Sequence, residues 1–223
     1  MKTLCALVHL WAGTALAGGT IAGTISFSGA APRLETLDRR SDPYCPGAEV
    51  TDPTVTLSRD GKALANVVVR ITEGAPAAAA PAEPLTIDQQ GCMYTPRVQA
   101  GVLGQRVQVK NGDGTLHNVH GYSGSKTVFN QAQPPGSKPL LKELKKTTVL
   151  TLKCDVHAWM AAYVVLSSNA FFATTGSDGA YVINDVPPGR YTIEAWHEKL
   201  GTQSAEITVE EGKAVDPRLG FKG

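Results

Sequence analysis

Leu152-Lys153-Cys154-Asp155-Val156-His157-Ala158-Trp159-Met160 places a thiol, an imidazole and a thioether within seven residues. Two residues separate each of these side chains from the next. Copper sites that carry electrons use two His and one Cys in a plane, with a weak axial Met. The stretch supplies three of those four ligands. We expect the fourth to be His117, in Leu116-His117-Asn118-Val119-His120.

The residues before Cys154 favour a strand. Alternation with a period of two puts Leu150, Leu152 and Cys154 on one face. We therefore expect Cys154 to point inward at the end of this strand. His157 and Met160 would follow on a short turn, and residues 163–166 would form the returning strand of a hairpin.

The first 17 residues have the pattern of a targeting sequence. Lys2 precedes an apolar run over residues 4–16, and the small-residue ending is Ala15-Leu16-Ala17. This pattern is typical of a cleaved secretory signal peptide and is too short to span a bilayer. We expect a periplasmic or secreted protein. No later stretch is long and apolar enough for a transmembrane segment.

Charge and patterning narrow the class further. Without Lys2 the chain has 20 basic and 20 acidic residues, and a net charge near zero argues against a nucleic-acid partner. Strand-forming runs separated by Gly, Pro, Asn and Asp predominate, and no long helical periodicity occurs. The sequence therefore predicts an all-β protein.

Three cysteines remain after cleavage of the predicted signal peptide: Cys45, Cys92 and Cys154. In an oxidising compartment an odd number leaves one thiol unpaired. Because Cys154 has the metal-ligand setting, elimination pairs Cys45 with Cys92. The alternative is that both are unpaired, buried thiols.

A family resemblance rests on several of these residues together. They are Tyr94-Thr95-Pro96, Asn111, His117-Asn118-Val119-His120 and the Cys154-x-x-His157-x-x-Met160 loop. Residues 85–168 resemble a cupredoxin of the amicyanin or plastocyanin type. The resemblance implies a Greek-key β-sandwich that passes single electrons. It also implies one mononuclear copper per chain, with His117, Cys154, His157 and Met160 as ligands.

The same resemblance implies further roles near the loop. The partner would be a redox protein, such as a dehydrogenase or a c-type cytochrome. The His157 imidazole edge would lie near the surface, inside an apolar contact patch of Ala158 and Trp159; the alternative places Trp159 in the core. Asn118 would brace the two ligand loops as a group outside the ligand set, or be an ordinary loop residue. His120 would face away from His117, although a fifth ligand stays open.

Residues 169–223 resemble a different module. Strand-like runs flank Ser177-Asp178-Gly179, and another follows Val186-Pro187-Pro188-Gly189. They are similar to a carboxypeptidase regulatory-like (transthyretin-like) domain, which implies a small prealbumin-like β-sandwich. Residues 18–75 resemble its first part, with strands expected over residues 19–27 and 65–71. We expect the cupredoxin to be inserted into this module, with a tandem arrangement as the alternative.

Other function classes stay open. A copper carrier or sensor would use the same ligands without transferring electrons between partners. An enzyme would need an additional, open, His-rich centre, and only four His remain after cleavage. We therefore expect a protein that is not an enzyme. A structural module without metal explains the spaced ligands least well.

Overall fold

The structure is a computed structural model that describes residues 17–45, 49–145 and 148–223. The predicted signal peptide, residues 1–17, lies outside the described residues except for Ala17. All regular elements in the described part are strands, which confirms the all-β prediction. Among these residues no helix is long and apolar enough to cross a membrane.

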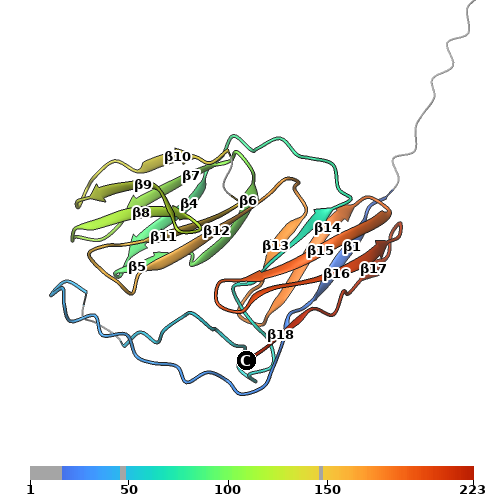
Figure 1. The fold of residues 1–223 in the computed structure, drawn as a ribbon, viewed down its shortest axis with the longest axis horizontal. Helices are drawn as coiled ribbons and strands as arrows, with labels where there is room; N and C mark the ends of the chain where they lie inside the picture. The colour runs from blue at the N-terminus through green and yellow to red at the C-terminus, as the bar shows by residue number, and fades with distance from the viewer. Residues whose placement is uncertain (1–16, 46–48, 146–147) are drawn as a thin grey trace, which may run out of the picture.

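The described residues form eighteen strands. Figure 1 shows their arrangement. The first nine are β1 (Gly19–Thr24), β2 (Ser26–Ser28), β3 (Val68–Glu73), β4 (Leu85–Gln90), β5 (Met93–Thr95), β6 (Val98–Val102), β7 (Arg106–Asn111), β8 (His117–Ser123) and β9 (Lys126–Gln133). The others are β10 (Leu140–Glu143), β11 (Val149–Lys153), β12 (Ala161–Ser167), β13 (Phe172–Thr174), β14 (Ala180–Val186), β15 (Gly189–His197), β16 (Gly201–Val209), β17 (Ala214–Val215) and β18 (Gly220–Lys222).

Strands β4–β12 form one sandwich, here called the inserted sandwich. Its sheets have the orders β10-β7-β4-β5 and β6-β12-β11-β8-β9. Alternating residues from both sheets fill a shared core, among them Ile87, Val107, Val119, Leu150 and Leu152. The expected hairpin is present, because β11 pairs antiparallel with β12 across the ligand loop.

The remaining strands form a second unit, here called the host module. It has sheets β14-β1-β17 and β13-β3-β15-β16 and the small pair β18-β2. The first three strands of the chain thus pair with strands that follow β12. β3 pairs with β13, so the chain leaves the host module and returns to it at neighbouring strands. This path is an insertion of β4–β12 between β3 and β13.

Two details differ from the expected strands. The run over residues 19–27 is divided into β1 and β2, which lie in different sheets. The run expected over residues 65–71 begins later, at Val68. Asn66 has a φ of 59°, which interrupts the extended backbone just before that strand.

Host module and inserted sandwich share a buried contact. Val68 of β3 packs with Val98 of β6 and Val165 of β12, and all three are buried. Arg70 of β3 extends from the host module and donates to the carbonyl oxygen of Leu166 at 2.9 Å. The two units are therefore joined by packing as well as by chain connections.

The connection from β2 to β3 is long, and its described parts, residues 29–45 and 49–67, contain no strand. It extends from the host module along the inserted sandwich (Figure 1). A bridge between Thr36 and Thr51 closes the base of this excursion. Its outer part carries Asp42 and Cys45 to the end of the sandwich where the ligand loop lies.

Candidate metal centre

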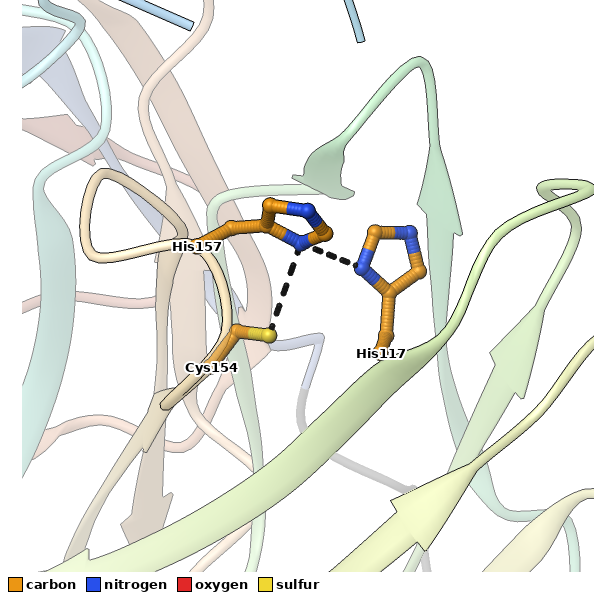
Figure 2. A group of neighbouring side chains, drawn as sticks. All are labelled: His117, Cys154 and His157. Carbon is orange, nitrogen blue, oxygen red and sulfur yellow. Dashed lines mark hydrogen bonds between the residues drawn. The ribbon is translucent and has the colours of Figure 1, made fainter. Parts of the chain in front are cut away.

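Three of the four predicted ligands converge in one buried place (Figure 2). His117 begins β8, Cys154 follows β11, and His157 lies in the connection to β12. The two Nδ1 atoms of the histidines are 2.9 Å apart, and the Cys154 Sγ is 3.7 Å from the Nδ1 of His157. The side chains come from neighbouring antiparallel strands, which explains how residues 40 positions apart meet.

Cys154 occupies the inward position that the alternation predicts. Leu150 and Leu152 of β11 are fully buried, and Cys154 is buried on the same face. Its thiol is not in a disulfide. The backbone N–H of Asn118 donates to Sγ at 3.4 Å, which is within the range for a hydrogen bond to sulfur.

Met160 closes the ligand loop and is fully buried in the same core as Cys154. Its backbone N–H donates to the carbonyl oxygen of His157 at 2.9 Å, which forms the short turn expected between them. The structure thus places Met160 at the inner end of the loop.

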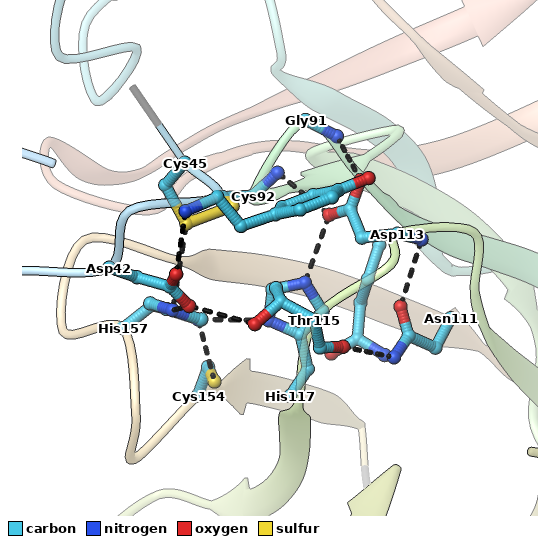
Figure 3. Close-up of polar contacts among 12 residues, drawn as sticks. Asp42, Cys45, Gly91, Cys92, Asn111, Asp113, Thr115, His117, Cys154 and His157 are labelled. Carbon is cyan, nitrogen blue, oxygen red and sulfur yellow. Dashed lines mark hydrogen bonds and ion pairs between the residues drawn. A yellow bond between two sulfur atoms is a disulfide. The ribbon is translucent and has the colours of Figure 1, made fainter. Parts of the chain in front are cut away.

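A carboxylate lies within hydrogen-bond distance of the Nε2 atom of each of these two histidines (Figure 3). Asp113 Oδ2 is 2.9 Å from Nε2 of His117, and Asp42 Oδ2 is 3.0 Å from Nε2 of His157. Sequence reasoning missed both carboxylates. Asp113 lies four residues before His117 in a turn, which is a weak local signal. Asp42 had no signal, because it is 115 residues from its partner.

This arrangement fits a bound cation. A carboxylate beside Nε2 selects the ring form with the proton on that nitrogen, so each Nδ1 carries a lone pair. Two lone pairs 2.9 Å apart repel each other unless a proton or a metal cation lies between them. Two imidazoles and one thiol are three of the four ligands of an electron-carrying copper site, and Met160, the fourth predicted ligand, is buried in the same core.

Burial and hydrogen bonds shift the pKa values of the surrounding groups. Burial lowers the pKa of His117, which keeps the ring neutral and able to bind a metal, although Asp113 acts in the opposite direction. The pKa of Asp42 is lowered first by the backbone N–H of Tyr44 and then by the hydroxyl of Thr115. Asp42 is therefore a carboxylate at neutral pH.

The predicted disulfide is present and lies against the centre. Cys45 and Cys92 are bonded, with Cα atoms 5.6 Å apart. Cys45 Sγ is 3.6 Å from Nε2 of His157. On the other side, Asp113 accepts hydrogen bonds from the backbone N–H groups of Gly91 and Cys92 at 2.7 and 2.8 Å. The disulfide therefore joins the segment that carries Asp42 to the β4–β5 turn, whose backbone N–H groups bind Asp113.

The expectation that the His157 edge lies near the surface is wrong. His157 is 0% exposed, because Asp42 and Cys45 cover its Nε2 edge. Ala158 is exposed, as a contact patch requires. Trp159 is only partly exposed: it packs against the core, and its indole N–H donates to the carbonyl oxygen of Cys92 at 2.9 Å.

Asn118 connects the two ligand-bearing segments. Its side-chain amide donates to Asp155 at 3.0 Å, and its carbonyl oxygen accepts from the backbone N–H of Asp155. The amide also donates to Asn130 at 2.6 Å. Asn118 therefore contacts the Cys154 loop through both its backbone and its side chain.

The remaining two histidines lie elsewhere. His120 is half-buried and contacts Asp155 at 3.0 Å and Thr127 at 2.9 Å, outside the group formed by the other two histidines and Cys154. His197 is buried in the host module, where its Nδ1 accepts from the backbone N–H groups of Lys199 and Leu200. Neither histidine is in a group of possible metal ligands within the described residues.

Comparisons with known proteins agree with two different resemblances. Residues 160–220 match the family model of the carboxypeptidase regulatory-like domain. This match begins directly before β12 of the inserted sandwich and ends at the first residue of β18 in the host module. No curated protein matches the chain by sequence.

Solved structures that resemble part of the chain include cupredoxins. A purple cupredoxin from Nitrosopumilus maritimus is 20% identical, with 37% of this chain and 99% of that chain covered and a TM-score of 0.33. Amicyanin from Paracoccus versutus is 17% identical, with 44% of this chain and 97% of that chain covered and a TM-score of 0.35. A copper-containing nitrite reductase from Thermus scotoductus is 15% identical, with 44% of this chain and 26% of that chain covered and a TM-score of 0.34. The chain is thus similar to cupredoxins over one part and to the regulatory-like domain over another.

Proposed function

We propose that the protein is an exported copper protein that transfers single electrons between redox partners. His117, Cys154, His157 and Met160 would hold one copper ion. The observation that carries the proposal is the meeting of two Nδ1 atoms and one free thiol in a buried site, at 2.9 and 3.7 Å. Copper, when bound there, would supply a Cu(II)/Cu(I) couple.

The protein's own residues support such a couple in three ways. The buried ligands keep water from the thiolate. Asn118 restrains the Cys154 loop, and Asp113 restrains the His117 ring. A site whose ligands are held in place needs little rearrangement when its charge changes by one.

Export is part of the proposal. The disulfide between Cys45 and Cys92 supports an oxidising compartment, because cytosolic thiols are kept reduced. The predicted signal peptide agrees with this location.

The proposed partner surface includes the exposed residue Ala158. Three exposed apolar side chains are close in sequence to site residues: Tyr44, Leu116 and Val156, which are 49%, 46% and 47% exposed. Exposed apolar groups favour brief docking of a redox protein. We propose a carrier and not an enzyme, because His120 and His197 are engaged in other polar contacts.

The test is a titration of the full mature chain with Cu(II), followed by visible and electron-paramagnetic-resonance spectra. We expect an intense thiolate-to-copper band that saturates at one copper per chain, disappears with ascorbate and returns on oxidation. Cys154→Ser removes the band. The control Cys45→Ser/Cys92→Ser removes two other sulfurs and retains it. Absence of binding in both oxidation states would reject the proposal.

The coverage of His157 favours a second candidate function, a copper carrier or sensor. A covered imidazole edge gives a partner protein no direct contact with this ligand. Stopped-flow oxidation of the reduced protein distinguishes the candidates. An electron carrier reacts rapidly with a c-type cytochrome, whereas a carrier of copper ions transfers the metal to a chelator faster than it transfers electrons.

A further inference from the structure

A segment from outside the inserted sandwich completes the candidate centre. Residues 41–45, here called the cap segment, belong to the excursion between β2 and β3 of the host module. They nevertheless contact His157, which lies between β11 and β12. Figure 3 shows Asp42 and the disulfide beside the two histidines.

Three kinds of contact fix the cap segment in this position. The Cys45–Cys92 disulfide anchors its end covalently to the turn between β4 and β5. The hydroxyl of Thr115 donates to Asp42 Oδ2 at 2.8 Å. The Tyr44 ring lies so close to Gly114 that a Cβ atom there would be 3.0 Å from it. The cap segment is therefore bound to the β4–β5 turn and to the connection between β7 and β8.

Hydrogen bonds within the cap segment orient the Asp42 carboxylate toward His157. Its Oδ1 accepts the backbone N–H of Tyr44 at 2.8 Å, and its backbone carbonyl accepts the N–H of Cys45 at 3.0 Å. These bonds leave Oδ2 directed at Thr115 and at Nε2 of His157, 3.0 Å away. The side chain is only 19% exposed, so water screens its charge weakly.

We propose that Asp42 is a positioning residue of the copper centre, which fixes the His157 ring and favours Cu(II) over Cu(I). The inference rests on the proposed copper function and deepens it. A carboxylate on the outer nitrogen holds Nδ1 toward Cys154 and makes the imidazole a stronger donor. A fixed negative charge near the metal stabilises the ion of higher charge more.

The experiment measures the reduction potential of the copper-loaded full chain and of Asp42→Asn. The amide retains the size and an acceptor oxygen but lacks the charge. We expect the thiolate band to remain, with one copper bound. The ratio of Cu(II) to Cu(I) affinity should fall about tenfold, as is usual for groups that support a ligand. For a one-electron couple this is a rise of about 59 mV.

Asp38→Asn is the matched control. Asp38 lies in the same connection between β2 and β3 and forms a surface ion pair with the neighbouring Arg40 at 2.7 Å. Asp38→Asn removes one negative charge from the same β2–β3 connection without changing a contact of His157. The reduction potential should therefore stay at the wild-type value. An equal rise in both variants would show a general charge effect and overturn the proposal.

A second variant keeps the test decisive if Asp42→Asn folds poorly. Cys45→Ala/Cys92→Ala removes the anchor of the cap segment, so it should raise the potential in the same direction as the loss of Asp42. Wild-type potentials in both variants, with the band present, would overturn the proposal and leave the copper function intact. A wild-type chain with no band would instead reject the copper function itself.

Discussion

Arg97 and Glu198 form a two-point ion pair between the inserted sandwich and the host module. The Nε and Nη2 atoms of Arg97 donate to the two carboxylate oxygens of Glu198 at 2.6 and 2.7 Å. The side chains are 10% and 3% exposed. Arg97 directly precedes β6, and Glu198 directly follows β15, so the pair joins strand ends of the two units.

Removal of one partner of this pair should be costly. Glu198→Ala leaves a buried guanidinium without its counter-charge, and we expect a loss of about 3–5 kcal/mol in the free energy of unfolding. Urea denaturation of the metal-free protein measures it. Glu210→Ala is the control, because Glu210 pairs with Lys213 on the surface and its loss should leave the midpoint unchanged. Equal midpoints for both variants would contradict the prediction.

The disulfide should stabilise the metal-free protein. It closes a loop of 47 residues, for which chain entropy predicts a contribution of about 4 kcal/mol. Cys45→Ala/Cys92→Ala should lower the free energy of unfolding by that order. Dithiothreitol should have a similar effect on the wild type and none on the variant. A reductant effect of equal size in both would assign the loss to another cause.

Acid should destabilise the host module through His197. Burial, with a smaller contribution from Arg97, lowers the pKa of His197 from 6.5 to about 4. Below pH 6.5 the unfolded chain takes up a proton that the folded chain does not, so stability falls as pH decreases and levels off near pH 4. The loss from this group is as much as about 3 kcal/mol.

His197→Asn tests this pH dependence. The Asn oxygen can replace Nδ1 as the acceptor for the backbone N–H groups of Lys199 and Leu200. The variant has lower stability at neutral pH because it leaves a small cavity, but it does not titrate. Its free energy of unfolding should therefore change less than that of the wild type between pH 6.5 and 4. Equal slopes in urea denaturation would contradict the assignment.

Asn118 should control how tightly the ligand loop is held. Asn118→Ala removes the side-chain contacts with Asp155 and Asn130, so copper affinity should fall about tenfold. Competition with a chelator measures the affinity. Asn184→Ala, at an exposed position in β14 of the host module, should leave it unchanged. An unchanged affinity in Asn118→Ala would show that the backbone contact to Cys154 is sufficient.

The sequence pattern around Cys154 predicted the part of the site that a single strand and its following turn form. Alternation in β11 indicates that Cys154 points inward, and the spacing to His157 and Met160 indicates a short turn; the structure contains both. The Cys45–Cys92 bond followed from counting thiols, which needs no knowledge of distance.

Contacts between residues far apart in the sequence could not be predicted from such local patterns. No periodicity relates Asp42 to His157, because the cap segment is irregular and its position depends on the folded host module. The surface exposure of His157 was therefore predicted wrongly from the inserted sandwich alone. Arg97 illustrates the same limit, since its partner Glu198 is 101 residues away.

The strand pairings of the host module have a consequence for the order of folding. Ser26 of β2 is paired with Gly220 of β18, so two strands far apart in the sequence must meet to complete this sheet. Within the described part of the chain, the strands of the inserted sandwich pair only with one another, between residues 85 and 167. Contacts of high sequence separation form slowly, whereas units with nearer partners fold earlier. We therefore expect the inserted sandwich to fold first and the distant strands of the host module, such as β2 and β18, to pair afterwards.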